Sequence, residues 1–359
     1  MNFSDRLLNW YDKNKRTLPW RNSQDPYKVW ISEIILQQTR IDQGLVYYNR
    51  FLNAFPDVRH LAAASEDEVL RLWQGLGYYS RARNLHRAAR DIVEMHNAEF
   101  PRCYQDWIRL KGIGPYTAAA IASIVFKEVV PALDGNAYRL LARVFALSYN
   151  KDSSKGKKQF LDVANQIIDT QRPGDFNQAM MDFGSLICKP ALPLCPECPM
   201  NDICVAFQND AVAGYPVKNP KRPVKIRHFN YFRITTYDQQ GNTLLYIRKR
   251  KENDIWKNLY DLPLLETARE ASPEELFKHP WWKSLIHCQN NYTIFRHPKQ
   301  RIHKLTHQTI KAKIYYVSVD AEHTRTLNKM FFAVDFERFE QLAKPRLIEL
   351  LNWNADNNE

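Results

Sequence analysis

Two carboxylates in the N-terminal half of the chain could take part in acid–base chemistry. The first, Glu33, lies in the stretch VWISEIILQQ and is the only charged residue between Lys28 and Arg40. A helix with so much apolar surface tends to be buried, and burial raises the pKa of a carboxyl group and keeps it protonated. A protonated carboxyl suits a general acid, although the same pattern is compatible with a glutamate on the exposed stripe of an amphipathic helix.

The second carboxylate, Asp134, lies in PALDGNAYRLLARVF, immediately before a clearly patterned helix. A residue at this position normally caps the helix by accepting backbone hydrogen bonds, and capping alone would explain it. A pair of carboxyl groups can also divide the cleavage of a glycosidic bond: an acid protonates the leaving group and a carboxylate stabilises the cationic sugar. Glu33 and Asp134 are therefore candidate partners in that chemistry.

Four of the six cysteines fall in one window with the spacing C-x6-C-x2-C-x5-C, namely Cys188, Cys195, Cys198 and Cys204. Four thiolates around one centre suit Zn²⁺ or an iron–sulfur cluster. A set of disulfides is the weaker interpretation, because a reducing compartment keeps thiols free. Zinc sites more often use two C-x2-C pairs, and this window contains only one such pair.

The stretch LKGIGPYTAAAIAS predicts a tight turn that leads into a helix. Gly112 and Gly114 can take positive φ without steric cost, and Pro115 suits the first helical position. Backbone N–H groups that converge on a helix N-terminus form an anion site, against which a nucleic-acid phosphate could lie. A plain turn between two helices is the alternative interpretation.

The composition favours a polyanionic partner. The chain has 359 residues, a formal net charge of +12 and a pI of about 9.3. A basic excess of this size favours nucleic acid over other partners, and the basic residues are spread along the chain rather than set on one amphipathic helix. Because no stretch is apolar enough to span a bilayer and no signal segment is evident, we expect a soluble, cytoplasmic protein without a membrane partner.

The pattern of apolar residues divides the chain into two domains of different class. Within residues 4–208, apolar residues recur with the three- and four-residue spacing of helices. After residue 228, apolar and polar residues alternate as they do in strands, and helical segments also occur. We expect a mainly α domain over residues 1–214, with the hairpin at about 110–126 and the cysteine loop at 188–204. The proline-rich, basic segment 215–228 is the expected linker, and residues 229–359 form a smaller α+β domain.

Several motifs together resemble those of the MutY-type adenine DNA glycosylases, over essentially the whole chain. They are LPWR, PYKVWISEIILQQT, WQGLGYYSRARNL, LKGIGPYTAAAI and ALDGNAYR. The LxGxG turn resembles the helix-hairpin-helix element of that superfamily, and the cysteine spacing matches its [4Fe–4S] loop. The C-terminal domain resembles the MutT-like (Nudix-like) module with which this family recognises 8-oxoguanine.

The resemblance implies a base excision repair enzyme that hydrolyses the N-glycosidic bond of adenine mispaired with 8-oxoguanine or guanine. Its partner would be duplex DNA, its cofactor a [4Fe–4S] cluster, and its expected state a monomer. Carried over by motif, Glu33 would protonate the adenine at N7 and help to activate water, and Asp134 would stabilise the cationic or covalent sugar intermediate. Asn136 would orient the Asp134 turn, and Tyr116 would lie in the reaction pocket.

The resemblance also implies a set of DNA-contacting residues. Gln38 and Tyr78 would wedge into the duplex beside the 8-oxoguanine, and Gly112 and Gly114 would hold a backbone phosphate. The residues expected near the adenine pocket are Arg16, Trp20, Arg21, Leu36 and Gln178.

The C-terminal domain departs from its relatives in two places. The lesion-sensing loop of the family usually reads Phe-Ser-His, and here, within IHKLTHQTI, it reads Leu305-Thr306-His307. Thr306 and His307 keep a hydroxyl and an imidazole for hydrogen bonding, whereas the aromatic ring is lost. The segment WKNLYDLPLLETAREASPEEL lacks the glycine and the run of glutamates that hold Mg²⁺ in MutT hydrolases, so we expect no nucleotide hydrolase activity.

Two other functions compete with this interpretation. An endonuclease III-like enzyme would cut the strand through a lysine that forms a Schiff base, but Tyr116 occupies that position here. We therefore expect a monofunctional glycosylase. A catalytically silent iron–sulfur DNA-binding protein would explain the charge, the hairpin and the cysteines, but it would not need both Glu33 and Asp134.

Overall fold

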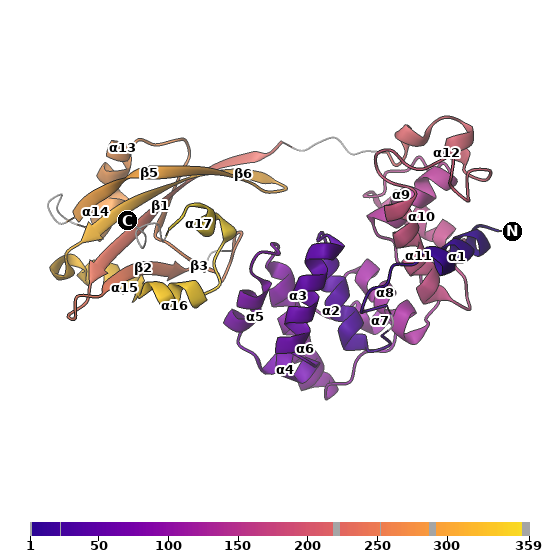
Figure 1. Cartoon of the computed structure of the whole chain (residues 1–359), viewed down its shortest axis with the longest axis horizontal. Helices are drawn as coiled ribbons and strands as arrows, with labels where there is room; N and C mark the ends of the chain where they lie inside the picture. Colours follow the sequence, from indigo (N-terminus) through magenta and orange to yellow (C-terminus); the bar gives the residue numbers. More distant parts are fainter. Residues whose placement is uncertain (1, 22, 218–222, 252, 287–291, 354–359) are drawn as a thin grey trace. The chain divides into compact units, whose positions relative to one another are not determined.

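The computed structural model describes residues 2–21, 23–217, 223–251, 253–286 and 292–353. The chain forms two compact units (Figure 1). The helical unit comprises residues 1–63 and 84–220, and the sheet unit comprises residues 64–83 and 221–359. Within the described residues, no helix has the length and apolar character needed to cross a bilayer.

The helical unit is built from helices whose ends carry the expected capping residues. Asn2 forms a capping box with Asp5 at the first helix, and prolines occupy the first turn of three others. Its helices are α1 (Phe3–Asn14), α2 (Pro26–Leu36), α3 (Ile41–Ala54), α4 (Val58–Ala63), α6 (Ser80–His96, which begins in the sheet unit), α7 (Tyr104–Trp107), α8 (Pro115–Phe126), α9 (Gly135–Val144), α10 (Ser154–Ile167), α11 (Pro173–Leu186), α12 (Val205–Gln208) and η1 (Val212–Gly214).

Helix α11 lies close to the N-terminal turn of α9, and a glycine permits this approach. A Cβ on Gly184 would lie 2.6 Å from the Cβ of Asn136 and 2.9 Å from its carbonyl oxygen. Atoms do not approach so closely, so a larger side chain at Gly184 would push the two helices apart. The packing of α11 thus fixes the turn that carries Asp134 and Asn136.

The sheet unit holds a seven-stranded mixed sheet within the described residues, with the order β3-β2-β1-β6-β5, β4 paired with β1 and β7 with β2. The central strands β1 and β6 are parallel, from Lys225 opposite Gln308 to Thr235 opposite Ser318, and the other pairs are antiparallel. The strands are β1 (Lys225–Tyr237), β2 (Thr243–Lys249), β3 (Tyr260–Asp261), β4 (Leu264–Thr267), β5 (Tyr292–Lys304), β6 (Gln308–Val319) and β7 (Phe332–Val334).

Helices cover both faces of this sheet. On one face Phe339, Leu347 and Trp353 pack against the strands, and on the other face Trp282 and Leu327 do so. The predicted combination of a mainly helical core and a smaller α+β domain is confirmed. The helices of the sheet unit are α5 (Glu66–Trp73), α13 (Pro273–Lys278), α14 (Pro280–Leu285), η3 (Ala321–His323), α15 (Arg325–Met330), α16 (Phe336–Gln341) and α17 (Arg346–Leu350).

Two boundaries differ from those expected from the sequence. The segment 64–83 belongs to the sheet unit, because Asp67 of α5 accepts hydrogen bonds from Lys249 (2.6 Å) and from the Tyr260 hydroxyl (2.9 Å). Strand β1 begins at Lys225, inside the expected linker 215–228, because its first residues already pair with β6. Positions 218–222 of that linker lie outside the described residues.

Candidate active site and nucleic-acid interface

One cavity of the helical unit, of about 800 Å³, gathers most of the predicted site residues. Helix α2 and the loop after it form one wall, and the first turns of α8 and α9 and the middle of α11 form the other. Segments far apart in the sequence therefore meet around one space. The predicted residues that line it are Arg16, Trp20, Arg21, Glu33, Leu36, Gln38, Tyr116, Asp134, Asn136 and Gln178.

Glu33 is a buried carboxyl group that lines this cavity. Its residue is 8% exposed, which settles in favour of burial the choice that the sequence pattern left open. Desolvation raises the pKa of Glu33 to about 7. The hydrogen bond with the Tyr116 hydroxyl lowers this pKa, and the negative charge of Asp134 raises it by a smaller amount. Near neutral pH a large share of Glu33 is therefore protonated and able to donate a proton.

Asp134 caps helix α9, as its position in the sequence predicts, and it also lines the cavity. Its Oδ1 accepts hydrogen bonds from the backbone N–H groups of Asn136 (2.9 Å) and Ala137 (2.7 Å) at the start of α9. Its Oδ2 accepts a third from the Asn136 side chain (2.7 Å). Burial raises the pKa of Asp134, although these donors favour the ionised form.

The side chain of Asn136 is itself held by a buried arginine of the same helix. Arg139 Nη2 donates to Asn136 Oδ1 (2.8 Å) and to the carbonyl of Gly184 (2.6 Å). Its Nε donates to the carbonyl of Cys188 (2.7 Å). One guanidinium thus connects the Asp134 turn, helix α11 and the start of the cysteine window, and sequence analysis did not single it out.

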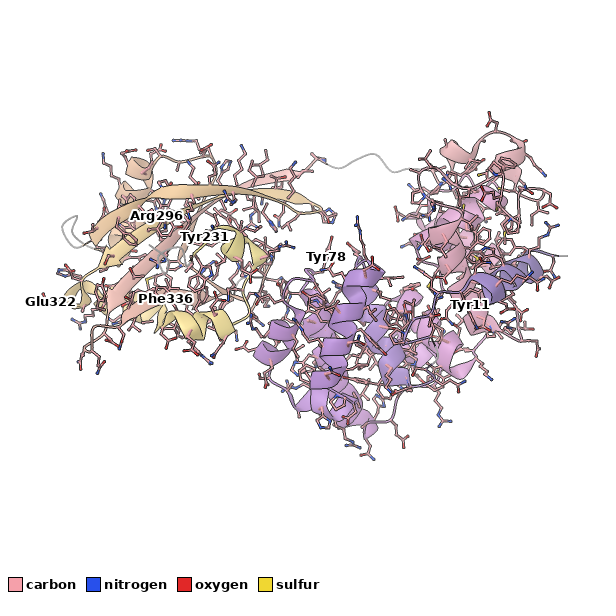
Figure 2. All side chains as sticks on the ribbon, viewed as in Figure 1. Tyr11, Tyr78, Tyr231, Arg296, Glu322 and Phe336 are labelled. Carbon is pink, nitrogen blue, oxygen red and sulfur yellow. The ribbon has the colours of Figure 1, made fainter. Side chains whose placement is uncertain are left out.

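Arg16 and Arg21 meet at an aspartate that sequence analysis also missed. Asp182 of α11 is fully buried, and it accepts hydrogen bonds from Arg16 Nε (2.9 Å) and Arg21 Nη2 (2.6 Å) as well as from a second nitrogen of each guanidinium. Although burial opposes it, these bonds hold the pKa of Asp182 below its ordinary value. The Arg21 guanidinium also lies 5.6 Å from the centre of the ring of Tyr11, which Figure 2 labels on α1.

The remaining cavity residues contribute shape more than charge. Trp20 is buried edge-on against Tyr48, with ring centres 5.0 Å apart. Gln178 is 8% exposed and donates weakly to the carbonyl of Gly174 (3.4 Å). Gln38 follows α2 in the left-handed region with φ of 58°, a conformation that L-residues adopt at a cost and that often marks functional loops.

The two glycines of the hairpin play different parts. Gly112 has φ of +80°, and a Cβ there would lie 2.4 Å from the Cβ of Asn84. Gly114 is instead the extended N-cap of α8, with φ of −95° and ψ of 174°, and a Cβ there would meet nothing within 4 Å. Only Gly112 therefore uses the conformational freedom of glycine, while Gly114 leaves the N-terminus of α8 uncovered.

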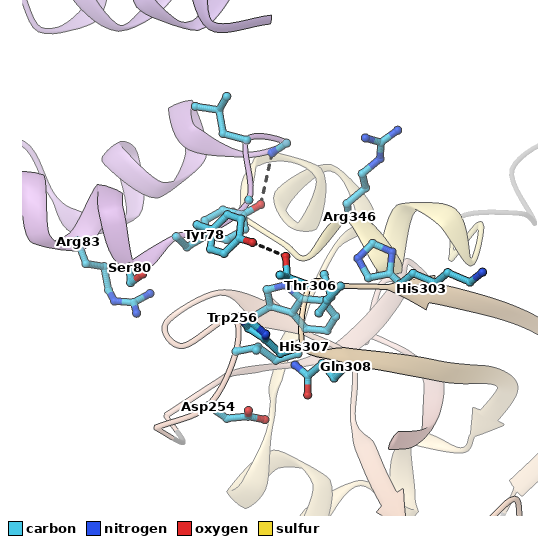
Figure 3. A pocket seen from close by; sticks show the side chains of 17 residues that line it. Tyr78, Ser80, Arg83, Asp254, Trp256, His303, Thr306, His307, Gln308 and Arg346 are labelled. Atoms are coloured by element: carbon cyan, nitrogen blue, oxygen red, sulfur yellow. Dashed lines mark hydrogen bonds between the residues drawn. The ribbon is translucent and has the colours of Figure 1, made fainter. Parts of the chain in front are cut away.

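A second cavity, of about 590 Å³, lies in the sheet unit and collects the other predicted DNA-contacting residues (Figure 3). Tyr78, Thr306 and His307 all line it. The Tyr78 hydroxyl and the Thr306 hydroxyl lie 2.5 Å apart and share a hydrogen bond. Tyr78 has φ of 46° and is 43% exposed, so a ring held in an uncommon backbone conformation faces solvent.

The four cysteines line one small pocket beside α9, together with Arg143. Arg143 Nη1 donates to the carbonyl of Lys189 (2.7 Å) and lies 3.4 Å from Cys188 Sγ. Among the described residues, no three His, Cys, Asp or Glu side chains converge closely enough to hold a single metal ion. A four-iron cluster takes one thiolate at each iron and so surrounds itself with more widely spaced ligands, and four cysteines around one pocket are compatible with it.

The arrangement in the helical unit can cleave a bond between a sugar and a basic leaving group. A buried acid with a pKa of about 7 and a second carboxylate held by three donors face the same space. Such a pair protonates a leaving group and stabilises the positive charge that develops on the sugar.

Comparison with known proteins agrees with this chemistry. Residues 31–166 match the HhH-GPD superfamily of base excision DNA repair proteins. A solved structure of a thermostable thymine-DNA glycosylase has a TM-score of 0.54 and 27% identity, and it covers 58% of this chain and 95% of that one.

Two curated relatives extend the comparison beyond this domain. The adenine DNA glycosylase of mouse is 44% identical over 57% of this chain, but the match spans only 42% of the mouse protein. That of Buchnera aphidicola from Schizaphis graminum is 36% identical over 74% of this chain and 75% of the relative. The resemblance seen in the motifs is thereby confirmed, and the chain belongs to the adenine DNA glycosylase family within the HhH-GPD superfamily.

Proposed function

We propose that this protein hydrolyses the N-glycosidic bond of adenine mispaired with 8-oxoguanine or guanine in duplex DNA. The observation that carries the proposal is the pairing of Glu33, whose pKa burial raises to about 7, with Asp134 in one cavity. An adenine in a duplex has to leave the base stack to reach a buried acid of this kind. The cavity of about 800 Å³ has room for a base and its sugar.

In the proposed reaction, protonated Glu33 donates its proton to the adenine ring. The bond between the sugar and the base then breaks with its electrons leaving on the adenine, and positive charge develops on the sugar. Asp134 faces that charge, which would favour its ionised form over the neutral one. Water then adds to the sugar, and the Glu33 carboxylate accepts the proton that the water releases.

The residues around the cavity favour base removal without strand cleavage. Tyr116 stands at the first turn of α8, and burial raises its pKa well above the ordinary value, so that it stays protonated. Its hydroxyl lies 3.3 Å from Met181 Sδ, and hydrogen bonding between Tyr116 and Glu33 lowers the pKa of that carboxyl. No lysine is found among the described residues that line the cavity. These lining residues therefore offer no side-chain amine for a Schiff base with the sugar, and we propose a monofunctional glycosylase.

We propose that the four cysteines hold a [4Fe–4S] cluster. When bound, the cluster would brace the loop that begins at Cys188, and it would require the thiols to lose their protons. Burial raises the pKa of the Cys198 thiol to about 11, and coordination to iron would displace its proton. Arg139 and Arg143 of α9 donate to carbonyls of this loop, which links its shape to the Asp134 turn.

The proposed DNA contacts come from the hairpin before α8, the loop after α2 and the cavity of the sheet unit. The uncovered N-terminus of α8 at Gly114 offers backbone N–H groups to a phosphate. Gln38 and Tyr78 would enter the duplex, and Thr306 and His307 would contact the base opposite the adenine. We propose that the protein acts on DNA as a monomer, with the helical part as the catalytic domain and the C-terminal part as the lesion-recognition domain.

A duplex with one adenine opposite 8-oxoguanine tests this function. Free adenine is measured by chromatography, and strand breaks are measured before and after alkali. We expect adenine release with breaks only after alkali treatment. No adenine release at saturating protein contradicts the proposal, and breaks without alkali together with a borohydride-trapped adduct indicate a lyase.

A further inference from the structure

The cavity of the sheet unit has the chemical composition of a nucleotide site. Trp256, Tyr78 and Tyr79 give it aromatic surface, and neutral hydrogen-bonding groups, basic side chains and Asp254 also line it. Ligand sites of this size, about 590 Å³ here, typically combine an apolar wall with a few polar groups. The members that matter to the argument are Trp256, His303, Thr306, His307, Lys304 and Arg346.

Trp256 is held in place by its own segment. It has φ of 63°, and the N–H of Leu259 donates to its carbonyl (3.0 Å), which closes a tight turn. Two residues earlier, Asp254 accepts hydrogen bonds from both terminal nitrogens of Arg227 (3.0 and 2.7 Å). The Arg250 guanidinium lies 5.9 Å from the centre of the Trp256 ring. The ring is therefore positioned before any ligand binds, which lowers the entropy that binding has to remove.

The aromatic rings that line this cavity include Trp256, Tyr78 and Tyr79, whereas the lesion-sensing loop contributes Leu305. Leu305, at the position where the family resemblance implies an aromatic residue, lines the cavity and packs against the core of the sheet unit, as Trp256 also does. The ring of His303 lies 6.0 Å from that of Trp256 at an angle of 49°, and burial lowers the pKa of His303, which leaves a neutral imidazole beside the indole. Figure 3 shows Trp256, His303 and Thr306 around the same cavity.

We propose that Trp256 is the stacking wall against which the purine opposite the excised adenine is held. The proposal rests on the proposed function and adds a residue that determines how the partner strand is recognised. A base presents a π-face whatever its identity, so Trp256 would contribute affinity for the partner base. Thr306 and His307 at the edge of the cavity would then distinguish 8-oxoguanine from guanine by hydrogen bonds.

The basic side chains at the cavity fit the rest of such a ligand. Lys304 and Arg346 line the cavity together with Arg83, whose guanidinium donates to the carbonyl of Lys257 (2.9 Å). Phosphates attract such groups without regard to base sequence. An aromatic wall flanked by cations suits one nucleotide of a DNA strand better than an uncharged small molecule.

A thermodynamic cycle between the tryptophan and the base tests the proposal. Wild type and Trp256→Ala are titrated with two duplexes that carry uncleavable 2′-fluoro-deoxyadenosine, one opposite 8-oxoguanine and one opposite an abasic analogue. Stacking on an aromatic side chain contributes about 1–3 kcal/mol per base, which corresponds to roughly 5- to 140-fold in affinity. We expect Trp256→Ala to lose that factor with 8-oxoguanine and to bind the abasic duplex as wild type does.

Two further variants separate stacking from folding. Trp256→Leu keeps apolar volume beside Phe229 but has no ring face, so it should show the same base-dependent loss. Trp281→Ala removes a half-buried tryptophan of the same unit outside the cavity and should show none. Equal losses on both duplexes, or a loss in Trp281→Ala as large as in Trp256→Ala, overturn the proposal. Because binding is measured, an absence of adenine release by wild type would count against the proposed function alone.

Discussion

Replacing Glu33 by glutamine tests the catalytic site most directly, because it removes one ionisable proton and keeps the shape of the side chain. Desolvation raises the pKa of Glu33 from 4.5 to about 7. At 1.36 kcal/mol per pKa unit, this difference corresponds to about 3 kcal/mol between the folded and unfolded states. The residue is 8% exposed, so solvent screens little of this energy.

The sign of the effect follows from where the proton is bound. Between pH 4.5 and about 7 the folded protein keeps the Glu33 proton, whereas the unfolded chain has lost it. The free energy of unfolding of the wild type therefore falls as pH rises through this window, and it falls no further from this group above about pH 7. Glutamine has no such proton, so the variant should gain about 3 kcal/mol relative to wild type across the window.

Two measurements test this prediction. Urea unfolding of both proteins at several pH values gives the difference in free energy, in which contributions of other groups largely cancel. Single-turnover adenine release gives the catalytic effect, for which loss of a general acid predicts a decrease of roughly 10²- to 10⁴-fold. In the wild type, release should slow as pH rises above about 7, where Glu33 loses its proton.

A stability difference that does not change between pH 4.5 and 7 would show that Glu33 is ordinarily solvated and would refute the reasoning. Duplex affinity is the control, because glutamine keeps a polar side chain of the same size where Glu33 would meet the adenine. A loss of affinity as large as the loss of base release would mean that Glu33 acts by holding the fold.

Three other predictions follow from particular contacts. Gly112→Ala should destabilise the protein by at least about 1–2 kcal/mol, because φ of +80° is strained for alanine and its Cβ would meet Asn84, as urea unfolding would show. Asp182→Ala leaves two arginines without their buried partner, so we expect a loss of about 3–5 kcal/mol in the same assay, with slower adenine release. Cys198→Ser should abolish the visible absorbance of a bound iron–sulfur cluster, measured by spectrophotometry on purified protein.

Two of these variants have a matched control. Gly114→Ala, at an extended position with open space around it, should change stability by less than about 0.5 kcal/mol and should weaken DNA binding instead. A comparable destabilisation of both hairpin variants would contradict the assignment of their different conformations. Cys103→Ser, outside the cysteine window, should leave absorbance intact, and colour that persists in Cys198→Ser would argue against that ligand. An unchanged free energy of unfolding in Asp182→Ala would mean that the buried ion pairs make no net contribution to the stability of the fold.

The amino-acid sequence by itself determined the features that depend on neighbouring residues. The position of Asp134 before a patterned helix predicts its cap, whereas the apolar surroundings of Glu33 made burial one of two interpretations that the structure then decided. Helical and strand periodicity divided the chain into its two classes of structure. These properties arise from backbone geometry and from which face of one element is apolar, so they can be recognised within a window of a few residues.

The contacts between distant segments were decided only by the tertiary structure. Asp182 meets Arg16 across 166 positions, and Arg139 reaches Cys188 across 49. The segment 64–83 joins the sheet unit through Asp67. None of these residues has a local pattern that distinguishes it from an exposed charge, because a long-range pair depends on which faces of separate elements meet. The same holds for Trp256, which shares its cavity with His303 and Thr306, about 50 positions later in the chain.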